Sequence, residues 1–151
     1  MRALPQPRIR QFRVQDVEEV VALWEACGLT RPWNDPRADI ARKLTTQPEL
    51  FLVLEGEDSN GATRIVGSVM AGYDGHRGWM YYLAVDPDQR GQGLGRLLVI
   101  EVEAKLVALG CPKTQLMVRT ENRQATGFYR SLGYEENDVI NLGKRLIADT
   151  H

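Results

Sequence analysis

The chain of 151 residues has little cysteine, and its two cysteines show no functional spacing. Cys27 and Cys111 form no C-x-x-C pair and stand beside no cluster of metal ligands. Zinc and redox sites need such a pair or cluster. We therefore interpret both cysteines as reduced, small apolar residues, and we predict no metal site.

Long apolar runs are also missing. No stretch approaches the roughly 20 apolar residues that a membrane-spanning helix requires. Residues 1–11 lack the apolar segment of a signal peptide. We expect a cytoplasmic protein with no membrane partner.

Net charge is close to zero, at −1, and the isoelectric point is about 6.1. No overall field attracts nucleic acid, so we expect no nucleic-acid partner, and any phosphate binding must be local. With 43% hydrophobic residues, the chain is long enough for one core and too short for two ordinary domains. We predict a single domain over residues 1–151, with residues 1–7 as a loose tail.

A glycine-rich loop joins an aromatic and β-branched segment, residues 79–85, to a segment with helical periodicity, residues 94–109. Glycines at alternate positions, Gly91, Gly93 and Gly95, leave no side chain between the backbone and a ligand. Successive N–H groups at a helix N-terminus bind anions, helped by the helix dipole. The loop therefore predicts a site for a phosphate or pyrophosphate.

Two better-known phosphate loops do not match. The dinucleotide pattern G-x-G-x-x-G would need glycine at Arg96, and no Gly-Lys-Ser/Thr of a Walker loop is present. The pattern Arg-x-x-Gly-x-Gly, formed by Arg90, Gly93 and Gly95, resembles the coenzyme A pyrophosphate motif of the GNAT superfamily of acyl-CoA-dependent N-acyltransferases. This resemblance implies acetyl-CoA as cosubstrate. The residues that it assigns to the cofactor are Leu83, Val85, Arg90, Gly91, Gln92, Gly93, Leu94, Gly95, Arg96 and Asn122.

A second motif lies downstream, where residues 122–134 resemble the family signature Asn-x-x-Ala-x-x-Phe/Leu-Tyr-x-x-x-Gly-Phe/Tyr. Tyr129 stands where many members place the tyrosine that protonates the departing thiolate, and Asn122 is assigned to the pantetheine arm. A phenol with a pKa of about 10 stays protonated at neutral pH. The resemblance implies direct transfer to a primary amine in a ternary complex, with Tyr129 as general acid.

The resemblance also implies an α/β fold of the GNAT type. We expect a mixed central sheet of about seven strands, splayed between the fourth and fifth, with about four flanking helices. The pantetheine arm pairs with the backbone of Leu83 and Val85 in this arrangement. The expected strands are residues 8–14, 50–55, 64–73, 79–85, 114–118 and a terminal pair between 134 and 146. The expected helices begin near residues 17, 36, 95 and 124.

The general base is not evident. Many family members carry a glutamate on the fourth strand near the positions of Trp79 and Tyr81, and this chain has none there. Glu121, Asp74, His76 or a water chain ending at a tyrosine are the alternatives. A site without a strong carboxylate favours α-amines, with a pKa of about 8, over lysine side chains at about 10.4.

The resemblance assigns acceptor selection to the connection between the first two helices and to the last strands; here that connection is residues 29–36, a segment with two prolines. Arg31 suits a carboxylate, Trp33 suits stacking on the acceptor, and Asn34 and Tyr73 complete the predicted acceptor site. Two alternatives stay open: Trp33 pins its loop to the core, and the turn after Tyr73 is only a hairpin.

The sequence thus predicts an acetyl-CoA-dependent N-acetyltransferase whose acceptor is a small molecule or a protein N-terminus. A catalytically weak coenzyme A sensor or regulatory module is the first alternative, because the expected glutamate is missing. A nucleotide-binding fold is the second. The acceptor, the acyl length and the choice between monomer and homodimer are left open.

Overall fold

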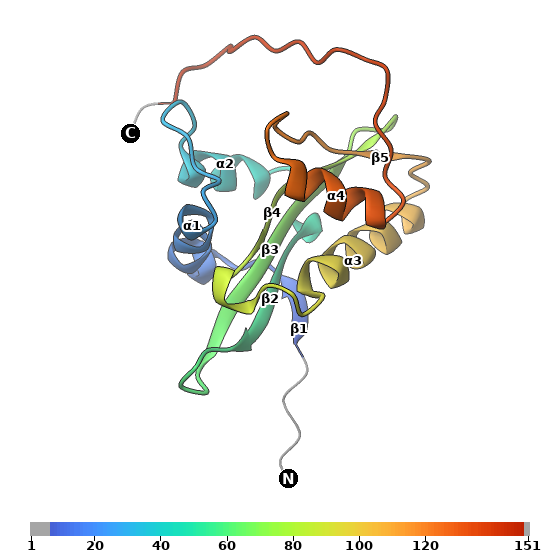
Figure 1. Cartoon of the computed structure of the whole chain (residues 1–151). Helices are drawn as coiled ribbons and strands as arrows, with labels where there is room; N and C mark the ends of the chain where they lie inside the picture. Colours follow the sequence, from blue (N-terminus) through green and yellow to red (C-terminus); the bar gives the residue numbers. More distant parts are fainter. Residues whose placement is uncertain (1–6, 150–151) are drawn as a thin grey trace.

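The computed structural model describes residues 7–149 and places helices on both faces of one five-stranded sheet (Figure 1). This confirms the predicted α/β architecture with a mixed sheet and four helices. The strands are β1 (Arg8–Gln11), β2 (Phe51–Glu57), β3 (Thr63–Tyr73), β4 (Gly78–Val85) and β5 (Thr114–Gln115). The helices are α1 (Val17–Ala26), α2 (Pro36–Lys43), α3 (Leu94–Ala108) and α4 (Arg123–Ser131).

The sheet has the order β1-β2-β3-β4-β5, antiparallel up to β4 and parallel between β4 and β5. The parallel pair requires a crossover, which α3 supplies. Residues 51–54 of β2 are buried without interruption because both sheet faces are covered. Leu52 and Leu54 pack on the α3 side, whereas Phe51 and Val53 pack on the α1 and α2 side.

The helix boundaries follow local signals. α1 buries Val20 and Trp24 and is followed by Gly28, whose φ of +70° suits a helix end. α2 begins as predicted, with Asp35 as N-cap and Pro36 in the first turn. No helix between residues 7 and 149 is long and apolar enough to cross a membrane.

The prediction of a final strand pair between residues 134 and 146 is wrong, and the sheet has five strands instead of about seven. Residues 135–149, here called the C-terminal segment, contain no helix or strand. β5 pairs through only two residues, so the sheet edge is too short to pair with a further long strand. Large apolar side chains of the segment are between 73% and 90% exposed: Val139, Ile140, Leu142, Leu146 and Ile147.

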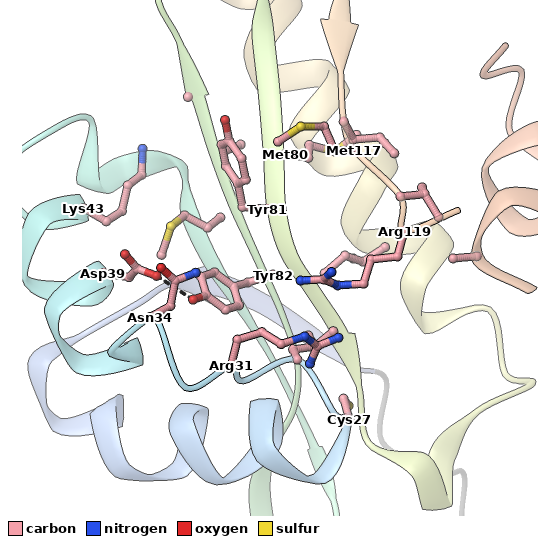
Figure 2. A pocket seen from close by; sticks show the side chains of 18 of the residues that line it. Cys27, Arg31, Asn34, Asp39, Lys43, Met80, Tyr81, Tyr82, Met117 and Arg119 are labelled. Carbon is pink, nitrogen blue, oxygen red and sulfur yellow. Dashed lines mark hydrogen bonds between the residues drawn. The ribbon is translucent and has the colours of Figure 1, made fainter. Parts of the chain in front are cut away.

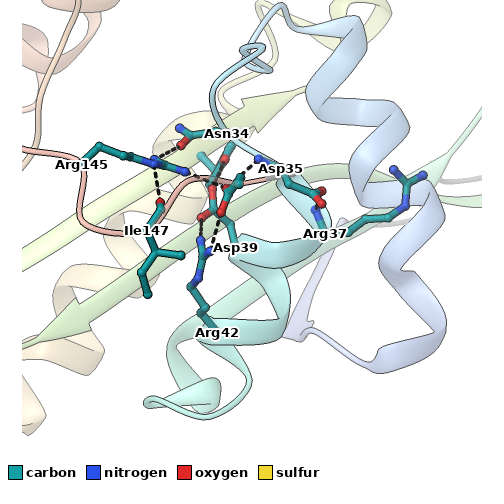
Figure 3. Close-up of polar contacts among 9 residues, drawn as sticks. Asn34, Asp35, Arg37, Asp39, Arg42, Arg145 and Ile147 are labelled. Carbon is teal, nitrogen blue, oxygen red and sulfur yellow. Dashed lines mark hydrogen bonds and ion pairs between the residues drawn. The ribbon is translucent and has the colours of Figure 1, made fainter. Parts of the chain in front are cut away.

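The C-terminal segment instead crosses to the loop between α1 and α2 (Figure 1). Arg145 donates to Asn34 Oδ1 at 2.6 Å, and the Asp35 N–H donates to Asp149 at 2.8 Å (Figure 3). Arg42 of α2 also pairs with Asp149. These polar contacts hold the end of the segment at α2, away from the sheet edge.

Candidate functional site

The glycine-rich loop presents an open backbone surface at the start of α3. Gly91 and Gly93 have φ values of +83° and +77°, which favour glycine, and a Cβ at either would meet no atom within 4 Å. The N–H groups of residues 93–96 donate to no acceptor within residues 7–149. Free N–H groups at a helix N-terminus form an anion site. The geometry therefore fits a pyrophosphate.

The third glycine of the motif has a different structural reason. A Cβ at Gly95 would approach the Phe128 ring to 3.2 Å, so glycine allows α4 to pack against the first turn of α3. Arg90 and Arg96 flank the loop and form no ion pair in the described part of the chain. They add local positive charge to a nearly neutral protein.

β4 and β5 splay apart as predicted. They pair only at Gly78↔Thr114 and Trp79↔Gln115, and residues 116–119 continue unpaired. A cavity of about 750 Å³ opens beside this gap (Figure 2), within the size range of ligand pockets. Its lining includes the predicted site residues Arg31, Asn34, Leu83, Asn122 and Tyr129.

Other predicted site residues are not part of the lining: Val85, Trp33, Tyr73 and the loop 90–96. The Val85 carbonyl accepts a hydrogen bond from the Cys27 thiol at 3.3 Å, and Tyr73 packs on the α3-side core. Trp33 is 56% exposed, with the Arg119 guanidinium 5.8 Å from its ring centre. Trp33 is therefore no core anchor, and that alternative is wrong.

β4 contains a bulge at the cavity. Ser68 pairs with Ala84 and Met70 with Tyr81, so β4 holds one more residue than β3 over this interval. Tyr82 adopts φ +54°, a left-handed conformation that costs a non-glycine residue about 1–2 kcal/mol. Bulges re-aim the backbone, and this one lies directly before Leu83.

A hydrogen-bonded chain of buried and half-buried side chains holds the bulge. The Trp24 indole N–H donates to Ser68 Oγ at 2.8 Å, and that hydroxyl donates to the Tyr82 carbonyl at 2.9 Å. The Tyr82 ring stacks on Trp24 with centres 3.8 Å apart, and its hydroxyl donates to Asp39 at 2.6 Å. The strained residue is thus fixed from both its backbone and its side chain.

Tyr129 of α4 lines the cavity from the side of the second motif. Its ring meets Phe128 and Tyr134 edge-on, with centres 5.1 and 5.7 Å apart. Burial raises the pKa of Tyr129 to about 12, and no hydrogen bond contributes to that shift. The phenol is therefore protonated at neutral pH and has a proton to donate.

None of the three predicted bases lines the cavity. Asp74 caps its own turn: the N–H groups of Arg77 and His76 donate to it at 2.8 Å and lower its pKa. His76 is exposed in the same turn, and Glu121 is exposed beside Thr120. All three therefore lie in loops outside the cavity in this structure.

Sequence reasoning missed several polar residues of the cavity, among them Asp39, Lys43, Tyr82 and Arg119. For Asp39 and Lys43 a signal was present, because a spacing of four residues places both on one helix face. That face lies beside Ile40, which is buried in the core. For Tyr82 and Arg119 no signal was present, since the bulge and the splayed segment depend on tertiary structure.

Comparison with known proteins agrees with this geometry. Residues 17–134 match the acetyltransferase (GNAT) family. An acetyltransferase of Yersinia pseudotuberculosis is 57% identical over 141 residues, which cover 93% of this chain and 96% of that protein. An acetyltransferase of Pectobacterium atrosepticum shows the same identity over the same shares of both chains. The match excludes the alternative of a nucleotide-binding fold.

The fold is also found in solved structures. Ard1 from Thermoplasma volcanium aligns with a TM-score of 0.72 and 26% identity, covering 84% of this chain and 81% of that one. The ribosomal-protein-S18-alanine N-acetyltransferase from Escherichia coli aligns with a TM-score of 0.68 and 23% identity, over 87% and 79% of the two chains. The chain therefore belongs to the GNAT acetyltransferase family, as an N-acetyltransferase that uses acetyl-CoA as its cosubstrate.

Proposed function

We propose that the protein transfers the acetyl group of acetyl-CoA directly to a primary amine, in a ternary complex inside the cavity between β4 and residues 116–119. One observation carries this proposal. The same cavity is lined by Asn122 and Tyr129 of the second motif and by Arg31 and Asn34 of the α1–α2 loop. Both substrates thus have access to one space.

The cofactor lies along the first motif and the splayed strands. Its pyrophosphate accepts hydrogen bonds from the free N–H groups of residues 93–96, with Arg90 and Arg96 beside it. The pantetheine arm pairs with the backbone of Leu83 and Val85 and contacts Asn122. The Val85 carbonyl has two lone pairs, so the bond from the Cys27 thiol leaves room for an amide N–H.

The reaction breaks one bond and forms another. The amine lone pair attacks the thioester carbonyl carbon, the C–N bond forms, and the tetrahedral oxyanion then expels the thiolate as the C–S bond breaks. The thiolate takes the phenolic proton of Tyr129, which is later replaced from water. A positioned acid of this kind contributes about 10²- to 10⁴-fold to a rate.

The acceptor enters beside the α1–α2 loop, where Arg31, Trp33 and Asn34 lie, with Tyr73 at the end of β3. The proton released by the amine passes to water, since Glu121, Asp74 and His76 are outside the cavity lining. Structural neighbours include an enzyme named for an alanine of a ribosomal protein and an aminoglycoside acetyltransferase. Their likeness is one of fold, so both small amines and protein N-termini belong in the test.

Thiol release with acetyl-CoA and a panel of amines tests the proposal, with mass spectrometry to identify the N-acetyl product. Calorimetry with acetyl-CoA runs beside it. We expect amine-dependent thiol release matched by product. A sensor or regulatory module would bind acetyl-CoA and release no thiol above the rate of hydrolysis.

A further inference from the structure

The charged groups of the cavity are mostly of one sign. Among residues 7–149, its lining contains a single carboxylate, Asp39, and no histidine. The lining also contains four cationic side chains: Arg31, Arg42, Lys43 and Arg119.

One of the cations is neutralised within the protein. Arg42 Nη1 lies 3.1 Å from Asp39 Oδ1, and Arg42 also pairs with Asp149 of the C-terminal segment (Figure 3). The second oxygen of Asp39 accepts from the Tyr82 hydroxyl at 2.6 Å. The only carboxylate of the lining is therefore occupied by Arg42 and Tyr82.

The other three cations form no ion pair within 4 Å among residues 7–149. Arg31 is held in place by hydrogen bonds from Nη1 to the carbonyls of Gly28 and Thr30, at 2.7 and 2.9 Å. Arg119 lies over the Trp33 ring. Both guanidinium groups are thus positioned by neutral partners, which leave their charge uncompensated.

Carboxylates outside the lining act on these three cations only from a distance. Glu121 is exposed and interacts electrostatically with Arg119 and Arg31, and Glu49 does so with Lys43. Solvent screens such exposed charges. Burial lowers the pKa of Lys43, against the smaller effect of Glu49, as expected for a half-buried ammonium without a contacting counter-ion.

We propose, on the basis of the function proposed above, that the acceptor is a small amine that bears a carboxylate, bound by Arg31 and Arg119. Figure 2 shows both guanidinium groups directed toward the gap between β4 and residues 116–119, with Lys43 on the far side of Tyr82. Guanidinium groups bind carboxylates through paired N–H donors. Lys43 adds a third positive charge on the α2 side.

This charge distribution also offers a way to form the neutral amine without a free carboxylate base. Nearby positive charges disfavour an ammonium group, so they promote the neutral amine that attacks the thioester. The positive charges favour a zwitterionic acceptor in two ways: they attract its carboxylate, and they make its ammonium group lose a proton more readily. Asp39 does not reverse this effect while Arg42 neutralises it.

The test compares matched acceptors with the full chain. Thiol release is measured for a set of α-amino acids and for the amide of each one, at fixed acetyl-CoA. We expect kcat/KM for the acid to exceed that for its amide by about 10- to 100-fold, the scale of hydrogen bonds to a charged group. The amide has the less basic amine, so intrinsic chemistry alone would favour the amide.

Variants test the assignment to particular residues. Arg31→Gln, Arg119→Gln and Lys43→Gln should each lower the acid-to-amide ratio about tenfold. Arg64→Gln and Lys105→Gln are matched controls, since these residues pair with Asp58 and Glu101 outside the cavity. Both controls should keep the wild-type ratio.

Equal kcat/KM for acids and amides, or a preference for amides or for cationic amines, would overturn this inference and leave the proposed function intact. An acid preference that survives Arg31→Gln, Arg119→Gln and Lys43→Gln would overturn the assignment of the carboxylate to this cavity. If no amine of any charge releases thiol while acetyl-CoA binds, the proposed function itself fails.

Discussion

The cofactor end and the acceptor end of the candidate site are built in different ways. The proposed cofactor end consists of two continuous stretches of chain: the glycine-rich loop with the start of α3, which lies outside the cavity lining, and the segment that leads into α4. The acceptor end combines the α1–α2 loop, one face of α2, the β4 bulge and residues 116–119. The first end is local in sequence, and the second exists only in the folded chain.

They also differ in the groups that they offer. The cofactor end presents backbone N–H groups. Their arrangement favours glycine at positions 91 and 93, where φ is positive, and depends little on other side chains. The acceptor end presents charged and aromatic side chains of fixed position. Substitutions should therefore affect cofactor binding and acceptor selection separately, and the following experiments test that separation.

The largest effect is expected at the cofactor end. Gly93→Glu places a carboxylate where the pyrophosphate binds, and a Cβ there meets open space, so the chain should still fold. Acetyl-CoA affinity should fall more than about 100-fold, equivalent to about 2.7 kcal/mol, as measured by calorimetry.

Gly93→Ala is the matched control for that change. It carries the same unfavourable left-handed φ, about 1–2 kcal/mol, without the charge or the bulk. We expect it to bind acetyl-CoA far better than Gly93→Glu does. Equal affinity of a folded Gly93→Glu protein and the wild type would disprove the cofactor assignment.

The next effect is expected where the two ends meet. Tyr129→Phe removes one hydroxyl, so turnover should fall about 10²- to 10⁴-fold while acetyl-CoA affinity barely changes. Because burial raises the pKa of Tyr129 to about 12, the acid form persists through alkaline pH. The wild-type rate profile should show no descending limb from Tyr129 below about pH 11.

Tyr134→Phe serves as control, since its hydroxyl donates to Glu103 instead of facing the cavity. It should retain most of the turnover. A Tyr129→Phe protein with wild-type turnover would remove Tyr129 from the mechanism.

A smaller effect is expected at the acceptor end. Trp33→Ala removes the ring under Arg119 and should lower kcat/KM for the acceptor roughly 3- to 10-fold. Acetyl-CoA affinity should stay within about twofold. Because Trp33 is 56% exposed, the free energy of unfolding should change by less than about 1 kcal/mol. Unaltered acceptor kinetics in this variant would exclude Trp33 from the acceptor site.

The smallest effect is expected from the anchor of the C-terminal segment. The Arg42 side chain and the Asp35 N–H lower the pKa of Asp149 below its ordinary value. A carboxylate with a lowered folded pKa stabilises the protein above its unfolded pKa, about 3.9, and that contribution is lost as the pH falls further. Thermal melts should show Asp149→Asn below wild type at pH 6, with the difference shrinking below about pH 4. A difference independent of pH would contradict this.

Much of the fold followed from sequence because its signals are local. The N-cap Asp35 with Pro36, the stop at Gly28 and the glycine-rich loop before α3 depend on neighbouring residues alone. The prediction of two terminal strands was wrong for a non-local reason. Strand formation needs a partner edge, and the apolar residues after Tyr134 do not reveal that β5 pairs through two residues.

The residues of the candidate site also divide into those that local sequence indicates and those that only the structure shows. The proposed cofactor residues lie in two sequence motifs, whereas Asp39 and Tyr82 are brought together by a bulge that no local pattern marks. The uncompensated charge of Arg119 and Lys43 could not be predicted either, since it depends on which carboxylates fail to reach them. Side-chain sites assembled across distant segments require the structure.

The central claim is direct transfer between the two ends of one cavity, and a single-turnover experiment tests it most directly. Enzyme in excess of acetyl-CoA is quenched with and without an amine that is a substrate, and both the free thiol and the intact protein mass are measured. The account predicts no thiol release and no acetylated protein without amine, and one N-acetyl product per thiol with it. Stoichiometric thiol release together with an acetylated enzyme in the absence of amine would contradict it.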